Sequence, residues 1–162
     1  MSDLAFPPAL AAALSVDFDY RDGEGVDFEP YDQFEPVEET AEWLPQWTEV
    51  ELDPADFRMF GCDGTGGYAG LWSGAVVFFG SEGEAGVVAR NLGDFLWLLA
   101  DGSGPLEAIE DPDRESQPDA AFTAVAEKWS DTPRKTAAEV VAAAAAAFPG
   151  FAEMVQGPAY SG

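Results

Sequence analysis

Carboxylates are the residues of this chain most suited to chemistry, and they are densest near the N-terminus. The stretch VDFDYRDGEGVDFEP, residues 16–30, contains Asp17, Asp19, Asp22, Glu24, Asp27 and Glu29. An EF-hand calcium loop that began at Asp17 would need oxygen ligands at its third and fifth positions, glycine at the sixth and glutamate at the twelfth. The last three of these positions hold Arg21, Asp22 and Phe28, so the pattern does not predict an EF-hand.

The same stretch alternates apolar and charged residues over 16–21 and again over 26–29, which predicts a β-hairpin. A three-residue loop at 22–24 places the aromatic side chains of both strands on one face, whereas a two-residue turn would mix the two faces. The sequence therefore predicts an acidic N-terminal hairpin with the three-residue loop.

Two like-charged pairs follow from this register. Asp19 lies opposite Asp27, and Asp17 lies opposite Glu29. Each such pair disfavours folding by about 0.2–1 kcal/mol. Two explanations remain open: a solvated acidic face on an acidic protein, or a docking surface for a cationic partner.

Residues 17–53 carry fourteen acids against Arg21 alone, together with several aromatic residues. The segment PVEETAEWLPQW, residues 36–47, predicts a helix with acids at its N-terminal end and Pro45 limiting it. Val37, Ala41 and Leu44 fall on one stripe of this helix. Trp43 and Trp47 share a second face, where both core packing and an exposed binding anchor remain open.

From residue 57 onward, short apolar runs separated by glycine turns predict an antiparallel meander. The predicted strands are 57–63, 68–72, 75–80 and 87–91. The predicted helices are 9–16, opened by Pro7-Pro8; 91–102, capped by Asn91 and stopped by Gly102; 118–129; and 132–148, capped by Thr132. Helix 91–102 is expected to cover one face of the sheet, and residues 101–118 are expected to form a polar loop.

The expected fold class is α+β: an antiparallel β-meander covered by helices, with the acidic N-terminal hairpin and a helical C-terminus. We expect one domain over residues 1–162, with a frayed tail at 157–162.

Histidine is absent, which excludes Ser-His and Cys-His nucleophiles and histidine-ligated metal sites. GTGGYA at 64–69 reads as a turn and a strand rather than as a dinucleotide motif. Glu82 and Glu84 are expected at a hairpin tip, and Cys62 is expected to be a small buried group in a strand. The sequence therefore predicts no catalytic residues, no metal site and no cofactor.

The net charge is −24, from 31 acids and 7 bases. Such a charge argues against direct binding to nucleic acid or to an anionic membrane and favours a basic protein as partner. There is no run of 18 apolar residues, and the apolar run at 9–16 follows Asp3 without Lys or Arg. We therefore expect neither a membrane span nor a signal peptide, and a cytoplasmic protein.

The segment FRMFGCDGTGGYAGLWSGAVVFFGSEGEAGVVARNLGDFLWLLADGSGP, from residue 57 to about 105, resembles the SUKH superfamily of bacterial immunity and cell-wall-regulator-like proteins. The resemblance lies in a strand-glycine-strand unit ending at Leu71-Trp72, a Val76-Val77 strand leading to a glycine turn, and the helix from Asn91 to Leu99. It implies a small α+β domain without catalytic residues. It also implies one of two roles, an antidote to a co-encoded polymorphic toxin, often a nuclease, or a scaffolding module.

Three functional classes remain open: an immunity protein that neutralises a basic toxin domain, a housekeeping scaffold or regulatory module without a toxin, and an enzyme that uses carboxylates only. The charge and the resemblance favour the first, so we expect no enzymatic activity. The candidate partner-binding residues are Asp17, Asp19, Tyr20, Asp22, Glu24, Asp27, Glu29, Tyr31, Trp43, Trp47, Glu82 and Glu84. Neighbouring genes would separate the first class from the second.

Overall fold

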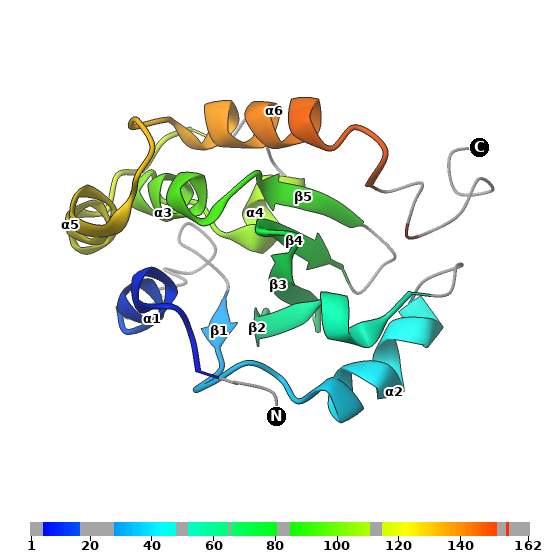
Figure 1. The fold of residues 1–162 in the computed structure, drawn as a ribbon. Helices are drawn as coiled ribbons and strands as arrows, with labels where there is room; N and C mark the ends of the chain where they lie inside the picture. Colours follow the sequence, from blue (N-terminus) through cyan, green and yellow to red (C-terminus); the bar gives the residue numbers. More distant parts are fainter. Residues whose placement is uncertain are drawn as a thin grey trace.

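The fold of this chain was obtained as a computed structural model (Figure 1), which describes residues 5–16, 28–47, 52–64, 66–80, 85–110, 115–151 and 155. The helices are α1 (Pro8–Leu14), α2 (Val37–Trp47), the 3-10 helix η2 (Pro54–Asp56), α3 (Leu92–Ala100), α4 (Pro105–Glu110), α5 (Ala120–Trp129) and α6 (Ala137–Ala147). The strands are β1 (Glu29–Pro30), β2 (Arg58–Cys62), β3 (Tyr68–Trp72), β4 (Ala75–Phe79) and β5 (Ala85–Ala89).

The sheet is a five-stranded antiparallel meander in which the strand order follows the chain, β1-β2-β3-β4-β5. The turn between β3 and β4 consists of two residues, Ser73 with φ 49° and Gly74 with φ 82°. Two successive positive φ values are the signature of a type I′ turn, whose twist matches that of the flanking strands. The predicted α+β fold class and the meander are confirmed.

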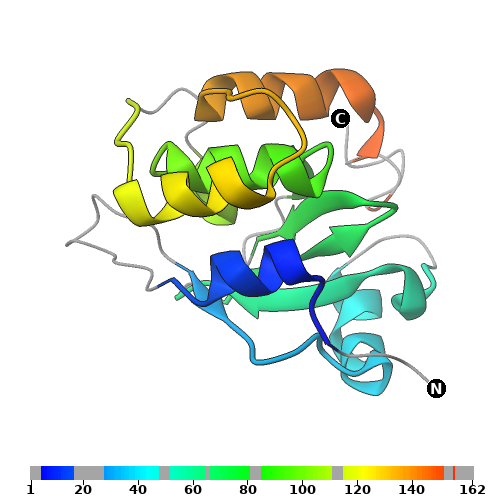
Figure 2. The ribbon, with the colours of Figure 1, turned by 60° about the vertical axis from the view of Figure 1, so that its left-hand side comes forward.

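Helices cover both faces of the sheet. Phe60 and Phe78 point to one face, where they belong to a core cluster with residues of α1, α3 and α5. Met59 and Phe79 point to the other face and cluster with Leu44 of α2. Figures 1 and 2 show α1, α3 and α5 on one side of the strands and α2 on the other. All five residues of β4 are buried, because β4 has a strand on each side and a covered surface on each face.

Helix α6 packs along β5, an edge strand of the sheet (Figure 1). Ala137 and Val140 belong to the core cluster on the α3 side, whereas Ala144 belongs to the cluster on the α2 side. The helix therefore spans the edge and joins the two halves of the core. Covering an edge strand in this way protects it from pairing with another chain.

The predicted start of α1 and both predicted ends of α3 are confirmed, whereas α1 ends at Leu14 rather than at residue 16. Pro8 stands in the first turn of α1. The Asn91 side chain accepts a hydrogen bond of 2.8 Å from the Asp94 amide at the start of α3, and Gly102 follows the helix with φ 86°. Helix α3 packs on β4 and β5, as expected of a helix that covers the sheet.

Two predictions for the C-terminal part are wrong. Residues 105–110 form α4 inside the segment expected to be a loop. Pro105 is the first residue of that helix, a position at which proline is favoured, so the proline does not exclude a helix there. Helix α6 is capped by Thr136 rather than Thr132: Thr136 Oγ1 accepts from the Glu139 amide at 3.2 Å, and Glu139 Oε1 accepts from the Thr136 amide at 3.0 Å. This capping box satisfies two amides at once, so it determines where the helix starts.

The buried side of α2 also differs from the prediction. Ala41 is exposed, whereas Thr40 and Leu44 are buried. Thr40 tolerates burial because its hydroxyl donates a hydrogen bond of 2.7 Å to Glu35 Oε1. Pro45 lies inside the last turn of the helix, which continues to Trp47.

The predicted N-terminal hairpin falls mainly on residues 17–27, outside the described residues, as does the tail at 157–162. At the end of the predicted hairpin, Glu29 pairs with Cys62 of β2. Among the described helices, none has the length and apolar character needed to cross a membrane.

Candidate functional site

The segment that leads from β1 into α2 is held on the sheet at two points. The Tyr31 amide donates to the Phe60 carbonyl at 2.9 Å, and the Glu35 amide donates to the Met59 carbonyl at 2.8 Å. Residues 32–34 therefore form a short loop with both ends attached to consecutive residues of β2. We call residues 31–35 the entry loop, because they lead into α2.

Glu35 connects the entry loop to α2. Its Oε1 atom accepts hydrogen bonds of 2.7 Å from both Thr40 Oγ1 and Trp43 Nε1. A carboxylate that accepts two side-chain donors holds them firmly, since hydrogen bonds to charged groups are stronger than neutral ones. The indole of Trp43 is thereby held against the sheet.

Trp43 stacks on Tyr68 of β3, with ring centroids 4.1 Å apart and planes at 9°. Trp47 meets the ring of Trp43 at 5.6 Å and that of Tyr68 at 5.3 Å, in both cases edge to face. All three side chains are half-buried. Both tryptophans therefore pack on the core cluster of the α2 side while part of each ring faces solvent.

The pKa of the Tyr31 phenol is raised above its ordinary value, chiefly by burial. The nearby Cys62, Glu35 and Tyr68 side chains raise this pKa further by charge repulsion, and so does a hydrogen bond between the phenol and the Cys62 thiol. The pKa of Tyr68 is also raised, first by burial and then by Glu35 and Cys62. Both phenols stay neutral near pH 7. Cys62, expected to be buried, is half-buried in β2 beside Tyr31.

A cavity of about 560 Å³ opens between the entry loop and the first turn of α2. The residues that line it are Tyr31, Asp32, Gln33, Phe34, Glu35, Pro36 and Glu39. The lining thus includes three carboxylates, which come from the loop and the helix, beside the half-buried ring of Tyr31. We call it the entry-loop cavity.

The acids around this cavity are not neutralised within the described part of the molecule. Glu38, Glu39 and Glu42 are exposed on α2, and their side chains form no hydrogen bond or ion pair with the described residues. Glu29 and Asp32 are exposed as well. These acids, Glu29, Asp32, Glu38, Glu39 and Glu42, and the half-buried rings of Tyr31, Trp43, Trp47 and Tyr68 belong to β1, the entry loop, α2 and β3. We refer to them together as the acidic-aromatic surface.

The basic side chains of the described residues are all engaged with other groups, and one of them lies over a ring of the entry loop. Arg90 Nε and Lys135 Nζ bind the fully buried Asp94 at 3.1 and 2.9 Å. The other three lie over aromatic rings: Arg58 over Phe34, Lys128 over Trp129 and Arg134 over Trp97. Four of the five described bases therefore lie away from the acidic-aromatic surface, and Arg58 is the one beside the entry loop.

The structure brings together part of the predicted site. Tyr31 and Trp43 meet around Glu35, Trp47 lies against Trp43, and Glu29 is exposed on the neighbouring strand β1. The remaining candidates, Asp17, Asp19, Tyr20, Asp22, Glu24, Asp27, Glu82 and Glu84, lie outside the described residues.

Sequence reasoning missed five members of this surface: Asp32, Glu38, Glu39, Glu42 and Tyr68. Glu39 could have been found, because it lies four residues before Trp43 on the predicted helix. The contact of Tyr68 with the tryptophans depends on how α2 crosses the sheet, which no local pattern encodes.

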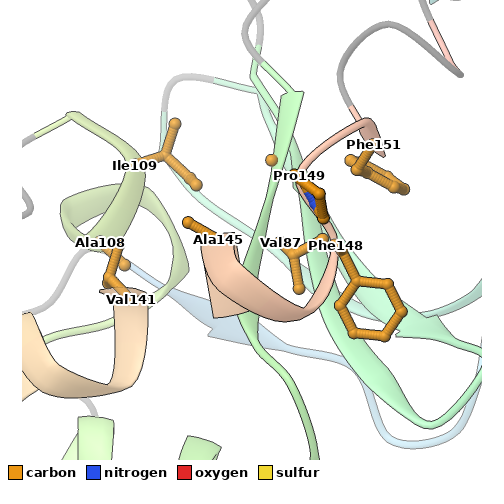
Figure 3. Close-up of a pocket in the computed structure, with 9 residues that line it drawn as sticks. Val87, Ala108, Ile109, Val141, Ala145, Phe148, Pro149 and Phe151 are labelled. Carbon is orange, nitrogen blue, oxygen red and sulfur yellow. The ribbon is translucent and has the colours of Figure 1, made fainter. Parts of the chain in front are cut away.

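A second hollow, of about 480 Å³, lies between β5, α4 and α6 (Figure 3). Its lining includes Val87, Ile109, Val141, Ala145, Phe148 and Phe151, and none of its lining residues has a polar side chain. Its side chains offer apolar contacts only, and nothing around it indicates an occupant.

No three carboxylates or thiols lie together as metal ligands in the part of the chain that the structure describes. No family model matches the chain, and neither a curated protein nor a solved structure matches it. Any assignment of function therefore depends on the geometry and charge of the acidic-aromatic surface.

Proposed function

We propose that this chain is a non-catalytic binding protein that captures a basic protein through the acidic-aromatic surface. The observation that carries the proposal is the set of exposed, unneutralised acids of β1, the entry loop and α2 beside half-buried aromatic rings. Stability does not explain all of these acids. Glu38 and Glu39 favour the helix N-terminus, but Glu42 lies one turn after Glu38, where a like charge costs about 0.2–0.5 kcal/mol.

The acids would act on the approach of the partner. A surface of one sign steers an oppositely charged protein by long-range attraction and raises the association rate, toward roughly 10⁸ M⁻¹s⁻¹ at low salt. The net charge of −24 adds to this attraction at distances beyond individual contacts.

The aromatic rings would act after contact. Trp43 is held by Glu35 on one side and by the ring of Tyr68 on another, so it loses little freedom when a partner covers it. Tryptophan and tyrosine are enriched among the residues that contribute most to binding at protein interfaces.

The resemblance of residues 57–105 to the SUKH superfamily extends the proposal to the partner. On that reading the chain is an immunity protein of the cytoplasm, and its partner is the basic toxin domain of a polymorphic toxin. For a nuclease toxin, the carboxylates would occupy the groove that otherwise holds phosphates.

The test is binding to the toxin-like C-terminal domain encoded beside this chain, measured by surface plasmon resonance over a series of salt concentrations. We expect a complex whose association slows steeply with salt. The variant Glu38→Lys/Glu42→Lys should slow association several-fold and flatten the salt dependence while changing dissociation less.

The matched control is Glu115→Lys/Glu127→Lys, which changes the net charge equally at exposed positions away from α2. It should slow association much less. If both variants behave alike, only the net charge matters and the acidic-aromatic surface is not the interface. If the neighbouring genes encode no toxin and no basic partner binds, the scaffold interpretation replaces this one.

A further inference from the structure

The carboxylate of Glu35 differs from the exposed acids of α2, because it is bound by side chains of the same chain. The Glu35 amide donates to the Met59 carbonyl at 2.8 Å, so the backbone of Glu35 is attached to β2. Its Oε1 atom accepts hydrogen bonds of 2.7 Å from Thr40 Oγ1 and from Trp43 Nε1, and both donors belong to α2. Glu35 therefore connects the sheet to the middle of α2.

Trp43 is restricted by contacts of two kinds. Its indole N–H donates to Glu35, and its ring stacks on Tyr68 with the centroids 4.1 Å apart. Trp47 and Phe79 meet the ring edge to face, with centroid distances of 5.6 and 5.9 Å. Aromatic contacts allow several ring arrangements, whereas a hydrogen bond fixes the direction of the indole N–H. The orientation of Trp43 is thus determined by Glu35.

We propose that Glu35 is the positioning residue of the acidic-aromatic surface. It holds Trp43 in the orientation that the basic partner contacts, and it acts through its acceptor atom rather than through its charge. This inference rests on the proposed function, because it names the residue that prepares one ring of that surface for binding. A ring that is fixed before the encounter does not have to be ordered by the partner. Glu35 therefore affects how long the complex lasts, whereas the exposed acids affect how fast it forms.

Two replacements separate the acceptor atom from the charge. Glu35→Gln removes the charge but keeps an oxygen that accepts from Trp43. Glu35→Leu removes both, and it is combined with Thr40→Val because Thr40, which is 1% exposed, would otherwise lose its acceptor at 2.7 Å. Thr40→Val alone is the matched control, since it leaves the bond between Glu35 and Trp43 in place.

The first measurement needs no partner and follows the indole N–H of Trp43 by proton–nitrogen correlation NMR. The signal is identified by its loss in Trp43→Phe. We expect Glu35→Leu/Thr40→Val to shift the signal and to speed its exchange with solvent. Glu35→Gln and Thr40→Val should change it far less. The indole of Trp97 donates to the Thr132 carbonyl at 2.8 Å, so its signal should stay in place as an internal reference.

The second measurement is dissociation from the toxin-like C-terminal domain encoded beside this chain, followed by surface plasmon resonance. We expect Glu35→Leu/Thr40→Val to dissociate about two- to tenfold faster, the range that ordering one side chain at an interface costs. Glu35→Gln and Thr40→Val should dissociate at nearly the original rate. In a chain that already carries Trp43→Phe, the indole N–H is missing, so Glu35→Leu/Thr40→Val should cause no further acceleration.

Four results would overturn the inference. The Trp43 signal keeps its position in Glu35→Leu/Thr40→Val, or that variant dissociates at the original rate. The acceleration persists in the Trp43→Phe chain, which would mean that Glu35 acts through the fold as a whole. Glu35→Gln dissociates as fast as Glu35→Leu/Thr40→Val, which would mean that the charge is what matters. The proposed function fails in a different way, namely when the unmodified chain forms no complex, and Glu35 then has no binding surface to prepare.

Discussion

At the scale of single residues, Glu35 combines two tasks. Its Oε1 atom holds Thr40 and Trp43, and its negative charge stays close to the phenols of Tyr31 and Tyr68. Together with burial, this charge makes both phenols harder to ionise when the chain is folded. The aromatic part of the surface is therefore neutral beside acids that are charged.

The raised pKa of Tyr31 predicts a loss of stability at alkaline pH. In the unfolded chain the phenol ionises near its ordinary pKa of 10.0, whereas in the folded chain it keeps its proton at higher pH. The folded state then binds more protons than the unfolded state, so the free energy of unfolding falls as pH rises above about 10.

Tyr31→Phe removes this contribution, and its free energy of unfolding should fall less between about pH 9 and 11. The measurement is urea unfolding at several pH values, with tyrosinate absorbance to follow ionisation. Equal slopes for the two proteins would mean that burial of Tyr31 does not affect its ionisation.

At the scale of elements, the start of α6 shows how a side-chain pair determines a helix boundary. Thr136 and Glu139 form the capping box. Upstream of it, the Thr132 carbonyl accepts from Trp97 Nε1 at 2.8 Å, and Lys135 reaches Asp94. The segment before α6 is thus attached to α3 and is not free to become helical.

Thr136→Ala should lower the free energy of unfolding by about 1 kcal/mol, the usual contribution of an N-cap, which corresponds to roughly 2–4 °C in melting temperature. Thr132→Ala should have a clearly smaller effect, because the backbone carbonyl of Thr132 remains. Thermal unfolding followed by circular dichroism measures both. A larger effect for Thr132→Ala would contradict the observed helix start.

The elements that were predicted correctly are those with local signals. Glycine turns separate β2, β3 and β4, and Asn91 with Gly102 marks the ends of α3. The errors arose where two local signals competed or where a partner lay far along the chain. Pro133 resembles a helix start, but the capping box at Thr136 prevails, and Thr40 is buried because Glu35 binds it.

The candidate site was predictable only in its composition. Tyr31, Trp43 and Trp47 could be singled out as aromatic residues in an acidic segment. The entry-loop cavity could not be predicted, because it depends on the attachment of Tyr31 and Glu35 to β2, a contact between segments more than twenty residues apart.

At the scale of the whole molecule, charge is unevenly distributed. Four of the described bases, Arg90, Lys128, Arg134 and Lys135, lie on or next to α3, α5 and the start of α6. The acids of the acidic-aromatic surface lie on β1, the entry loop and α2. Helix α2 lies on the side of the sheet opposite to α3 and α5 (Figure 2). Exposed acids, among them Glu115, Glu127, Asp131 and Glu139, also lie on the side of these bases. The members of the acidic-aromatic surface include no base, so the contrast between the two sides lies in the bases.

The net charge also predicts that salt stabilises the fold. Repulsion among the acids favours the unfolded chain, and salt screens it, since the Debye length falls to about 10 Å at 0.1 M. We expect the melting temperature to rise between low salt and about 0.2 M NaCl. Differential scanning calorimetry measures it, and a flat or falling curve would show that the acids do not repel one another appreciably.

The order of the strands also affects how the chain folds during synthesis. Each strand pairs with the next one along the chain, so β2 to β5 can assemble as soon as they leave the ribosome, with short loops to close. The helix that covers the β5 edge, α6, is made only after α3, α4 and α5. Until then β5 is an open edge on the nascent chain, and aggregation between growing chains would begin there.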